Sequence, residues 1–244
     1  MIKKAILVCM VYLPAVFVVT SVLLVALLRW VPLKYTPLML RRSVESGSAI
    51  KPIQKWVSLD EVSQEMICAV ICSEDARFFQ HQGFDYYEIR KEIREYRSYS
   101  SEQGGEKRHL RGCSTISQQT AKNCFTFCGR SWFRKAIETY YTVLIEKIWG
   151  KERILEVYLN VIETGPAMFG IEAASMAYYR LPPSQLNTVE AASIACCLPD
   201  PLHRNPMWVN VNMPGRISAL AENSLALGHK NMPPLTPKRA ALTK

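Results

Sequence analysis

Two adjacent acids, Glu74 and Asp75, follow an apolar run and could supply a proton acceptor. The run, Met66–Ile71, predicts a buried helix that carries both acids at its end. At helical spacing Glu74, Phe78 and His81 share one face. A carboxylate held beside aromatic rings loses water, which raises its pKa above the ordinary value of about 4.3. Such a group is suited to general-base catalysis.

A purely structural interpretation of the same stretch stays open. The acid pair would then be a solvated helix terminus, and Phe78 a core residue, because perturbed acids are often only structural. In either case Asp75 is expected to point away from Glu74. Gly83 can end the following turn with a positive φ.

A second polar cluster begins at Ser114 and ends at Lys122. Ser114 or Thr115 can cap the start of a helix. The polar side chains then lie on one face of that helix or beside it: Ser114, Thr115, Gln118, Gln119 and Lys122. Uncharged hydrogen-bonding groups that end in one lysine suit a sugar-phosphate ligand. A plain polar helix face would show the same pattern.

A third helix, expected to begin at Arg130, carries a second candidate carboxylate, Glu138. Arg134 and Glu138 stand four residues apart, which is compatible with a simple surface ion pair. The functional interpretation turns Glu138 inward, with Arg134 as its supporting cation. Arg130 and Lys135 would then hold phosphate oxygens.

Helical periodicity dominates the chain after Leu59, so the domain is predicted to be mostly α-helical. A first helix opens at Asp60 and runs into the Glu74 motif. Residues 100–111 are polar and predict a mobile loop. Further helices are expected at 86–99, 151–160, 171–179 and 189–197, and a last basic helix and tail at 216–244 is expected to be peripheral.

The uncharged run from Ala5 to Leu28 predicts a membrane-spanning helix, because about 20 apolar residues cross the hydrocarbon core. A cleaved signal peptide has a shorter apolar region, of roughly 7–15 residues, so an uncleaved anchor is expected. Trp30 and Tyr35 would mark the membrane interface. Positive charges lie on both sides of the run, and they do not by themselves give its orientation.

The net charge and the cysteines say less about the binding partners of the protein. The 244-residue chain has a formal net charge of +9, which fits attraction to phosphates or anionic headgroups but also a merely soluble basic surface. The eight cysteines lack the ligand spacing of a zinc site. We interpret them as small core hydrophobes.

Four motifs in this order resemble those of the bacterial peptidoglycan glycosyltransferases. They are E-D-x-x-F-x-x-H-x-G at 74–83, G-x-S-T-I-S-Q-Q-x-x-K-N at 112–123, R-K-x-x-E at 134–138 and K-x-x-I-L-E-x-Y-L-N at 151–160. The same domain opens the class A penicillin-binding proteins. No transpeptidase domain is expected here, so the chain resembles the monofunctional biosynthetic transglycosylases.

The resemblance implies a fold and a location. The fold is a mostly α, lysozyme-like glycosyltransferase domain behind a single N-terminal transmembrane helix. The location is the bacterial inner membrane, crossed once, with the catalytic domain in the periplasm. The chain then divides into a cytoplasmic tip and anchor at 1–30, a linker at 31–56, the glycosyltransferase domain at 57–205 and a C-terminal helix and basic tail at 206–244.

The resemblance also implies a mechanism, with lipid II as acceptor and the growing lipid-linked glycan strand as donor. Glu74 would take the proton from the acceptor GlcNAc 4-hydroxyl as it attacks C1 of the donor MurNAc. Loss of an α-linked diphosphate would leave a β-1,4 bond, with inversion. Lys122, Arg130 and Lys135 would stabilise the departing diphosphate, and Glu138 would position these cations or a divalent ion. The donor would be oriented by Ser114, Thr115, Gln118 and Gln119, and the site supported by Asp75, Phe78, His81 and Arg134.

No cofactor is required by this sequence, although Mg²⁺ or Mn²⁺ could bind at the diphosphate. The expected partners are lipid II, the glycan strand, the membrane and other cell-wall synthesis proteins, without nucleic acid. A lytic transglycosylase or muramidase is one alternative, but it needs no cationic cluster. A non-catalytic cell-wall scaffold is another, but it has no need of Glu74 and Glu138 together with the polar helix.

Overall fold

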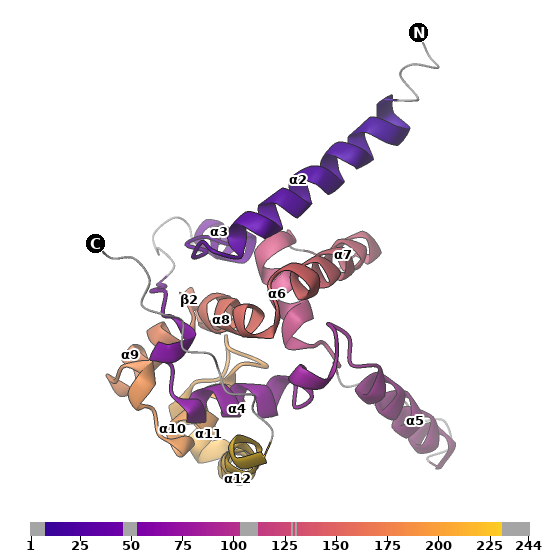
Figure 1. Cartoon of the computed structure of the whole chain (residues 1–244). Helices are drawn as coiled ribbons and strands as arrows, with labels where there is room; N and C mark the ends of the chain where they lie inside the picture. Colours follow the sequence, from indigo (N-terminus) through magenta and orange to yellow (C-terminus); the bar gives the residue numbers. More distant parts are fainter. Residues whose placement is uncertain (1–7, 46–52, 103–111, 128, 130, 231–244) are drawn as a thin grey trace, which may run out of the picture.

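Helices dominate the computed structural model, which describes residues 8–45, 53–102, 112–127, 129 and 131–230 (Figure 1). The predicted mostly α-helical fold is confirmed. In chain order the elements are η1 Val8–Tyr12, α2 Leu13–Leu28, α3 Pro37–Glu45, η2 Leu59–Glu61, α4 Gln64–Glu74, η3 Phe78–Gln80, α5 Tyr86–Glu102, α6 Ile116–Phe125, α7 Trp132–Ile148, α8 Lys151–Val161, β1 Glu163–Gly165, β2 Met168–Phe169, α9 Ile171–Tyr179, η4 Pro183–Gln185, α10 Thr188–Cys197, α11 Pro206–Asn212 and α12 Pro214–Lys230.

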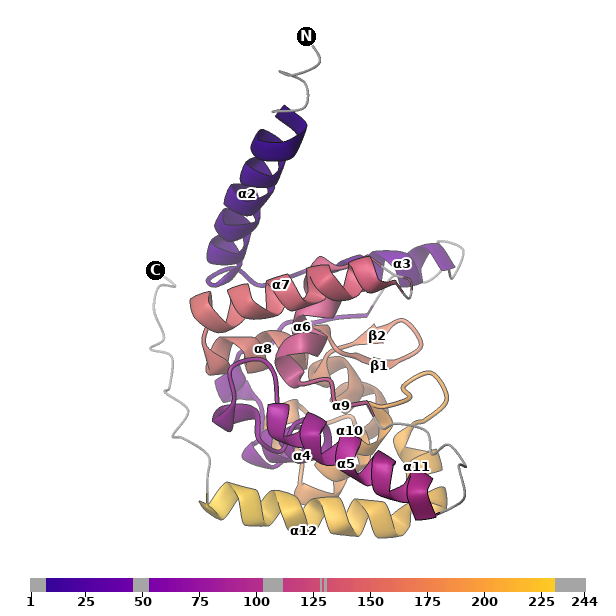
Figure 2. The ribbon, with the colours of Figure 1, turned by 90° about the vertical axis from the view of Figure 1, so that its right-hand side faces the viewer.

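The domain has one end close to the apolar helix α2 and one end far from it. Helix α7 lies beside the base of α2, α3 lies at the same end of the domain, and α12 lies at the opposite end (Figures 1 and 2). α12 packs against α4 and α10, and Ile217, Leu220 and Ser224 on one of its faces are buried. The expectation of a peripheral C-terminal helix is therefore wrong for Pro214–Lys230. Residues 231–244 lie outside the described part of the chain.

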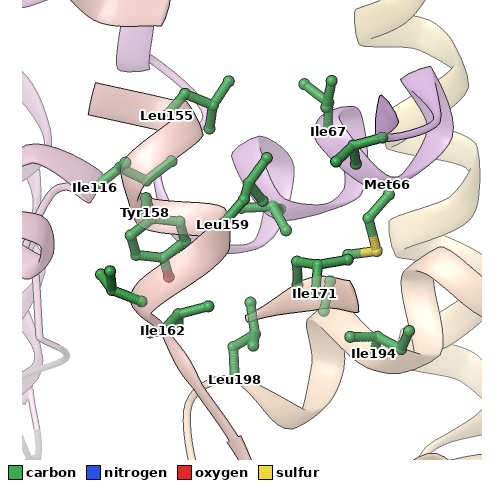
Figure 3. Close-up of a cluster of buried hydrophobic side chains, with 14 of the residues drawn as sticks. Met66, Ile67, Ile116, Leu155, Tyr158, Leu159, Ile162, Ile171, Ile194 and Leu198 are labelled. Carbon is green, nitrogen blue, oxygen red and sulfur yellow. The ribbon is translucent and has the colours of Figure 1, made fainter. Parts of the chain in front are cut away.

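Helix α8 forms the centre of the core. Nine consecutive residues, Arg153–Val161, are buried, so this helix is enclosed on every side rather than on one apolar stripe. Leu159 of α8 lies among Met66 of α4, Ile171 of α9 and Ile194 of α10 (Figure 3). The core thus holds α4 and α8 together, and these two helices carry groups of the site described below.

The end of η1 and the whole of α2 form Met10–Leu28, a 19-residue helical stretch long and apolar enough to cross a membrane. Its C-terminal half is bound to the domain. Ser21 Oγ lies 2.6 Å from the Tyr140 hydroxyl, and the Trp149 indole N–H donates to the Val25 carbonyl at 2.7 Å. The apolar helix and α7 therefore form one connected unit.

The segment 31–56, expected to be a linker, contains the folded helix α3. α3 packs against α6, with Met39 buried, and Arg42 forms two hydrogen bonds to Glu163 at 2.7 and 2.8 Å. Its prolines suggested a linker, but Pro37 is the first residue of the helix, where proline is favoured. Residues 46–52 lie outside the described part.

Several predicted boundaries shift. The helix expected to open at Asp60 begins at Gln64, because Leu59–Glu61 form the separate helix η2. Helix α5 continues to Glu102 rather than ending at Tyr99, and residues 103–111 of the predicted loop lie outside the described part. Helix α7 begins at Trp132, because the Ser131 hydroxyl caps it by accepting the Arg134 N–H at 3.1 Å. The interpretation of cysteines as core residues is confirmed for four described ones, which are buried free thiols: Cys68, Cys124, Cys196 and Cys197.

Candidate active site

Two pockets at the end of α4 share Glu74, and we describe them as the two lobes of one cleft. The first, here called the acidic lobe, lies between the end of α4, α5 and residues 112–115, and its charged residues are Glu74, Asp75, Arg77, Asp85, Glu88, Lys91, Glu92 and Glu95. The second, here called the basic lobe, is lined from α3, α6, α7 and residues 162–163 and 198–201. Its described charged residues are Arg41, Arg42, Glu74, Lys122, Arg134 and Glu163. Glu74 therefore stands where an acidic and a basic surface meet.

The chain leaves the helical conformation directly after Glu74, because Asp75 adopts φ −161° and ψ 71°. Glu74, Phe78 and His81 consequently do not share a helix face, and that prediction is wrong. Phe78 is fully buried, with Lys151 Nζ 4.4 Å from the centre of its ring. The prediction failed because it assumed that the helix continues to His81, whereas α4 ends at Glu74.

Asp75 is buried and joins α4 to α6. His81 Nε2 lies 2.9 and 3.1 Å from its two carboxylate oxygens, and the Ile116 N–H donates to Oδ2 at 3.0 Å. Ile116 is the first residue of α6, so the carboxylate also meets the positive end of the helix dipole. This link sets the N-terminus of α6 against the end of α4, and it brings Gln119 next to Glu74.

Gln119 orients the Glu74 carboxylate. Its Nε2 donates to Glu74 Oε2 at 2.8 Å, and its Oε1 accepts from the Tyr158 hydroxyl at 3.2 Å. Complete burial raises the pKa of Tyr158 well above its ordinary value, so the hydroxyl stays protonated and able to donate. Tyr158 therefore acts on Glu74 through Gln119. Its place in an apolar stripe indicated packing only, and no sequence signal marked this second role.

Thr115 and Gln118 build the start of α6. The Gln118 N–H donates to Thr115 Oγ1 at 3.2 Å, and the Thr115 N–H donates to Gln118 Oε1 at 3.1 Å, which is a capping box. The Thr115 hydroxyl also donates to the Gly83 carbonyl at 2.7 Å. Gly83 has φ +89°, as its role in the turn predicted. Ser114 precedes the cap and is exposed in the acidic lobe, so it does not share a helix face with Gln118 and Lys122.

Lys122 lies in the basic lobe, one turn beyond Gln119. Lys122 is exposed to solvent, although protein atoms surround its ammonium group and partly desolvate it. This desolvation lowers the pKa of Lys122, and Glu138 partly opposes the shift by favouring the charged form. Charged Lys122 lines the basic lobe, where it could attract the oxygens of an incoming phosphate.

Glu138 faces inward, with 3% of its side chain exposed. Arg134 Nη1 donates to its Oε2 at 2.8 Å, and Lys135 Nζ donates to its Oε1 at 2.5 Å. Of these two cations, Arg134 lines the basic lobe, whereas the predicted contact of Lys135 with a diphosphate stays a prediction. Arg130 lies outside the described residues.

Three carboxylates near the cleft, those of Glu138, Asp75 and Asp85, already have protein partners, so they fit a divalent cation poorly. Both oxygens of Glu138 accept from Arg134 and Lys135. Asp75, His81 and Asp85 are close enough to hold a metal, but Asp75 serves α6 and Asp85 caps α5 through two backbone N–H groups at 3.0 and 3.1 Å. We therefore assign no step of the reaction to a metal held by these side chains.

Comparison with known proteins places this geometry in a family. Residues 44–224 match the family model described as Transglycosylase. The chain belongs to this family. The matched range begins earlier and ends later than the predicted domain at 57–205. It includes the last two residues of α3 and much of α12.

Relatives of this transglycosylase share most of its length and carry one name, "Biosynthetic peptidoglycan transglycosylase". The relative from Bdellovibrio bacteriovorus is 46% identical over 188 residues, which cover 76% of this chain and 72% of the relative. That from Pasteurella multocida is 45% identical over 204 residues, covering 82% and 78%. That from Pseudomonas aeruginosa is 43% identical over 189 residues, covering 76% and 78%. The resemblance drawn from the four motifs is confirmed.

Proposed function

We propose that this transglycosylase polymerises lipid II into β-1,4-linked glycan strands and releases undecaprenyl diphosphate. The observation that carries the proposal is the place of Glu74 between the acidic and the basic lobe. Strand extension needs a base at the bond that forms, with an uncharged hydroxyl acceptor on one side and a diphosphate leaving group on the other. The cleft offers that arrangement.

The chemistry assigns one lobe to each substrate. The acceptor GlcNAc 4-hydroxyl approaches from the acidic lobe and gives its proton to Glu74 as it attacks C1 of the donor MurNAc. The C1–oxygen bond to the diphosphate breaks on the opposite face of the sugar, so an α-linked donor yields a β-1,4 bond. Gln119 and Tyr158 hold the Glu74 carboxylate in the position from which it accepts the proton.

The basic lobe stabilises the leaving group. A diphosphate departs with its own negative charge, so it needs fixed cations rather than a proton donor. Lys122 and Arg134 supply them from α6 and α7, and Glu138 keeps the Arg134 guanidinium in place. A Mg²⁺ or Mn²⁺ ion, where one takes part, would be carried by the phosphate oxygens, because Glu138 is already paired.

The reaction belongs at a membrane surface. We propose a single-pass protein of the bacterial inner membrane with its catalytic domain in the periplasm, which fits the apolar helix ending at Leu28 and the docking of its C-terminal half on α7. Lipid II and the lipid-linked strand would then reach the two lobes from the membrane. Other cell-wall synthesis proteins would be its partners.

Two labelled substrates test this function. The detergent-solubilised protein is incubated with fluorescent lipid II and, separately, with preformed glycan, and the products are resolved on a gel. We expect long polymer from lipid II and no shortening of the glycan. Shortened glycan without polymer would instead indicate a lytic transglycosylase or muramidase. A folded protein that changes neither substrate would indicate a scaffold.

A further inference from the structure

Helix α3 forms one wall of the basic lobe, although it precedes all four sequence motifs. Leu38, Arg41 and Arg42 line the lobe from this helix, together with Lys122 and Arg134 from α6 and α7. The three α3 residues are spaced i, i+3 and i+4, so they share one helix face. The lobe therefore has cations on two walls, and neither Arg41 nor Arg42 was among the predicted phosphate contacts.

Arg42 holds the wall in place. Its Nε and Nη2 donate to the two carboxylate oxygens of Glu163 at 2.7 and 2.8 Å, and the Glu163 side chain is only 8% exposed. These hydrogen bonds raise the pKa of Arg42. A bidentate pair of this kind has a fixed geometry. Arg42 is thus a positioning residue that ties α3, the helix that carries Arg41, to β1.

Arg41 is held far less firmly. Its Nε donates to Glu45 Oε1 at 2.5 Å, but the two side chains are 45% and 41% exposed. Ion pairs between exposed side chains are weak, because water and salt screen them. A diphosphate carries more charge than one carboxylate and accepts the two parallel hydrogen bonds of a guanidinium. It would therefore displace Glu45 from Arg41.

Helices α3 and α7 both lie at the end of the domain nearest α2, whereas α12 lies at the other end (Figures 1 and 2). Arg41 and Arg134 line the basic lobe from these two helices. A phosphate group that enters from a membrane around α2 would approach the lobe from the end of the domain that carries both of them.

We propose that Arg41 binds the diphosphate of the lipid-linked substrate and makes the basic lobe selective for a diphosphate over a monophosphate. Lys122 and Arg134 hold the group from one side and Arg41 from the other. A single phosphate would be held by one wall only. This proposal rests on the proposed function, because it concerns the leaving group of the same reaction.

Prenyl phosphates test the proposal without catalysis. Binding of farnesyl diphosphate and farnesyl monophosphate is measured in detergent with the full chain carrying Glu74→Gln, with and without Arg41→Gln. We expect Arg41→Gln to weaken diphosphate binding by about tenfold and monophosphate binding by less than about twofold. Arg90→Gln is the matched control, since it removes the same charge from an exposed site on α5 outside both lobes.

Two results would overturn the proposal: unchanged diphosphate binding after Arg41→Gln, or an equal loss for the two ligands or for the Arg90 control. Glu45→Gln gives a second check, because it removes the carboxylate that competes with the diphosphate for Arg41 and should leave diphosphate binding equal or tighter. A polymerisation assay distinguishes failure of the Arg41 proposal from failure of the proposed function. A wild type that polymerises lipid II with the same KM as Arg41→Gln contradicts the role of Arg41 alone, whereas a wild type without activity contradicts the proposed function.

Discussion

At the scale of single residues, the site depends on a chain of three groups from three helices. Tyr158 of α8 fixes the amide of Gln119 on α6, and that amide fixes the carboxylate of Glu74 at the end of α4. The sequence identified Glu74 as an acid at the end of an apolar run and Gln119 as a member of a polar cluster. It could not identify Tyr158, since a tyrosine inside an apolar helix looks like any core residue until its hydroxyl is seen to have a partner.

The role of Tyr158 is tested by Tyr158→Phe. Loss of its hydroxyl leaves Gln119 free to turn, and one neutral hydrogen bond corresponds to about a 3- to 10-fold change. We therefore expect kcat for lipid II polymerisation to fall by about that factor, with little change in KM. Tyr178→Phe is the control, because the Tyr178 hydroxyl donates to the Thr164 carbonyl at 3.3 Å instead. A role in packing alone would lower Tm in the first variant and leave kcat unchanged.

The lowered pKa of Lys122 predicts how activity depends on pH. Desolvation lowers its pKa, so the folded protein binds this proton less tightly than the unfolded chain does. The cost of keeping Lys122 charged is present below its folded pKa and disappears as the pH rises toward about 10.4, the ordinary value for lysine. If charged Lys122 is needed for the leaving group, activity should fall at a pH below that ordinary value.

The corresponding experiment compares kcat/KM across alkaline pH for wild type and Lys122→Arg. A guanidinium stays charged throughout, so the variant should lose activity only at higher pH than wild type. Lys55→Arg, which changes a lysine paired with Glu172 outside the cleft, should leave the profile as it is. Identical alkaline limbs in wild type and Lys122→Arg would show that Lys122 is not the titrating group.

At the scale of elements, hydrophobic spacing predicted helix type well and helix limits less well. The helix at 171–179 was predicted with the bounds that the structure shows. The helix before Glu74 was extended too far, because its end depends on the backbone conformation of Asp75 and not on any apolar pattern. Helix α3 was missed for a similar reason, since its stability comes from Met39 packing in the core and from the distant Glu163.

The link between α4 and α6 is tested by Asp75→Asn. An amide cannot accept with both of its heteroatoms, so it loses either part of the contact with His81 or the bond from the Ile116 N–H. We expect a loss of about 1–3 kcal/mol in unfolding free energy, which corresponds to several degrees in Tm. The rate should fall as well, because α6 carries Gln119. Asp60→Asn, at an exposed acid in η2, is the matched control. Unchanged Tm and rate would contradict the link.

At the scale of the whole molecule, the apolar helix is a structural part of the domain. Arg153 Nη2 donates to the Leu28 and Val31 carbonyls at 2.9 and 2.7 Å, and the Trp149 indole N–H donates to Val25. The sequence predicted a spanning helix from length and composition, but it could not show that buried groups of α7 and α8 use that helix as an acceptor. Such contacts join residues more than a hundred positions apart.

Deletion of residues 1–28 tests this connection. It leaves the buried Trp149 and Arg153 donors without their carbonyl partners in α2, each worth about 1 kcal/mol or more. We expect Tm in detergent to fall by several degrees relative to the full chain. Trp149→Phe in the full chain should reproduce part of that loss. Equal Tm values for the full and the shortened chain would show that the helix is only a tether.

The most direct test of the central claim is the effect of Glu74→Gln on chemistry and on binding, measured on the same preparation. Single-turnover extension with saturating lipid II gives the chemical step, and equilibrium binding of lipid II gives the affinity. If Glu74 is the general base, the rate should fall by about 10²- to 10⁴-fold while binding stays within about twofold. A variant that extends glycan at a rate within tenfold of wild type would contradict the assignment of Glu74 as the base.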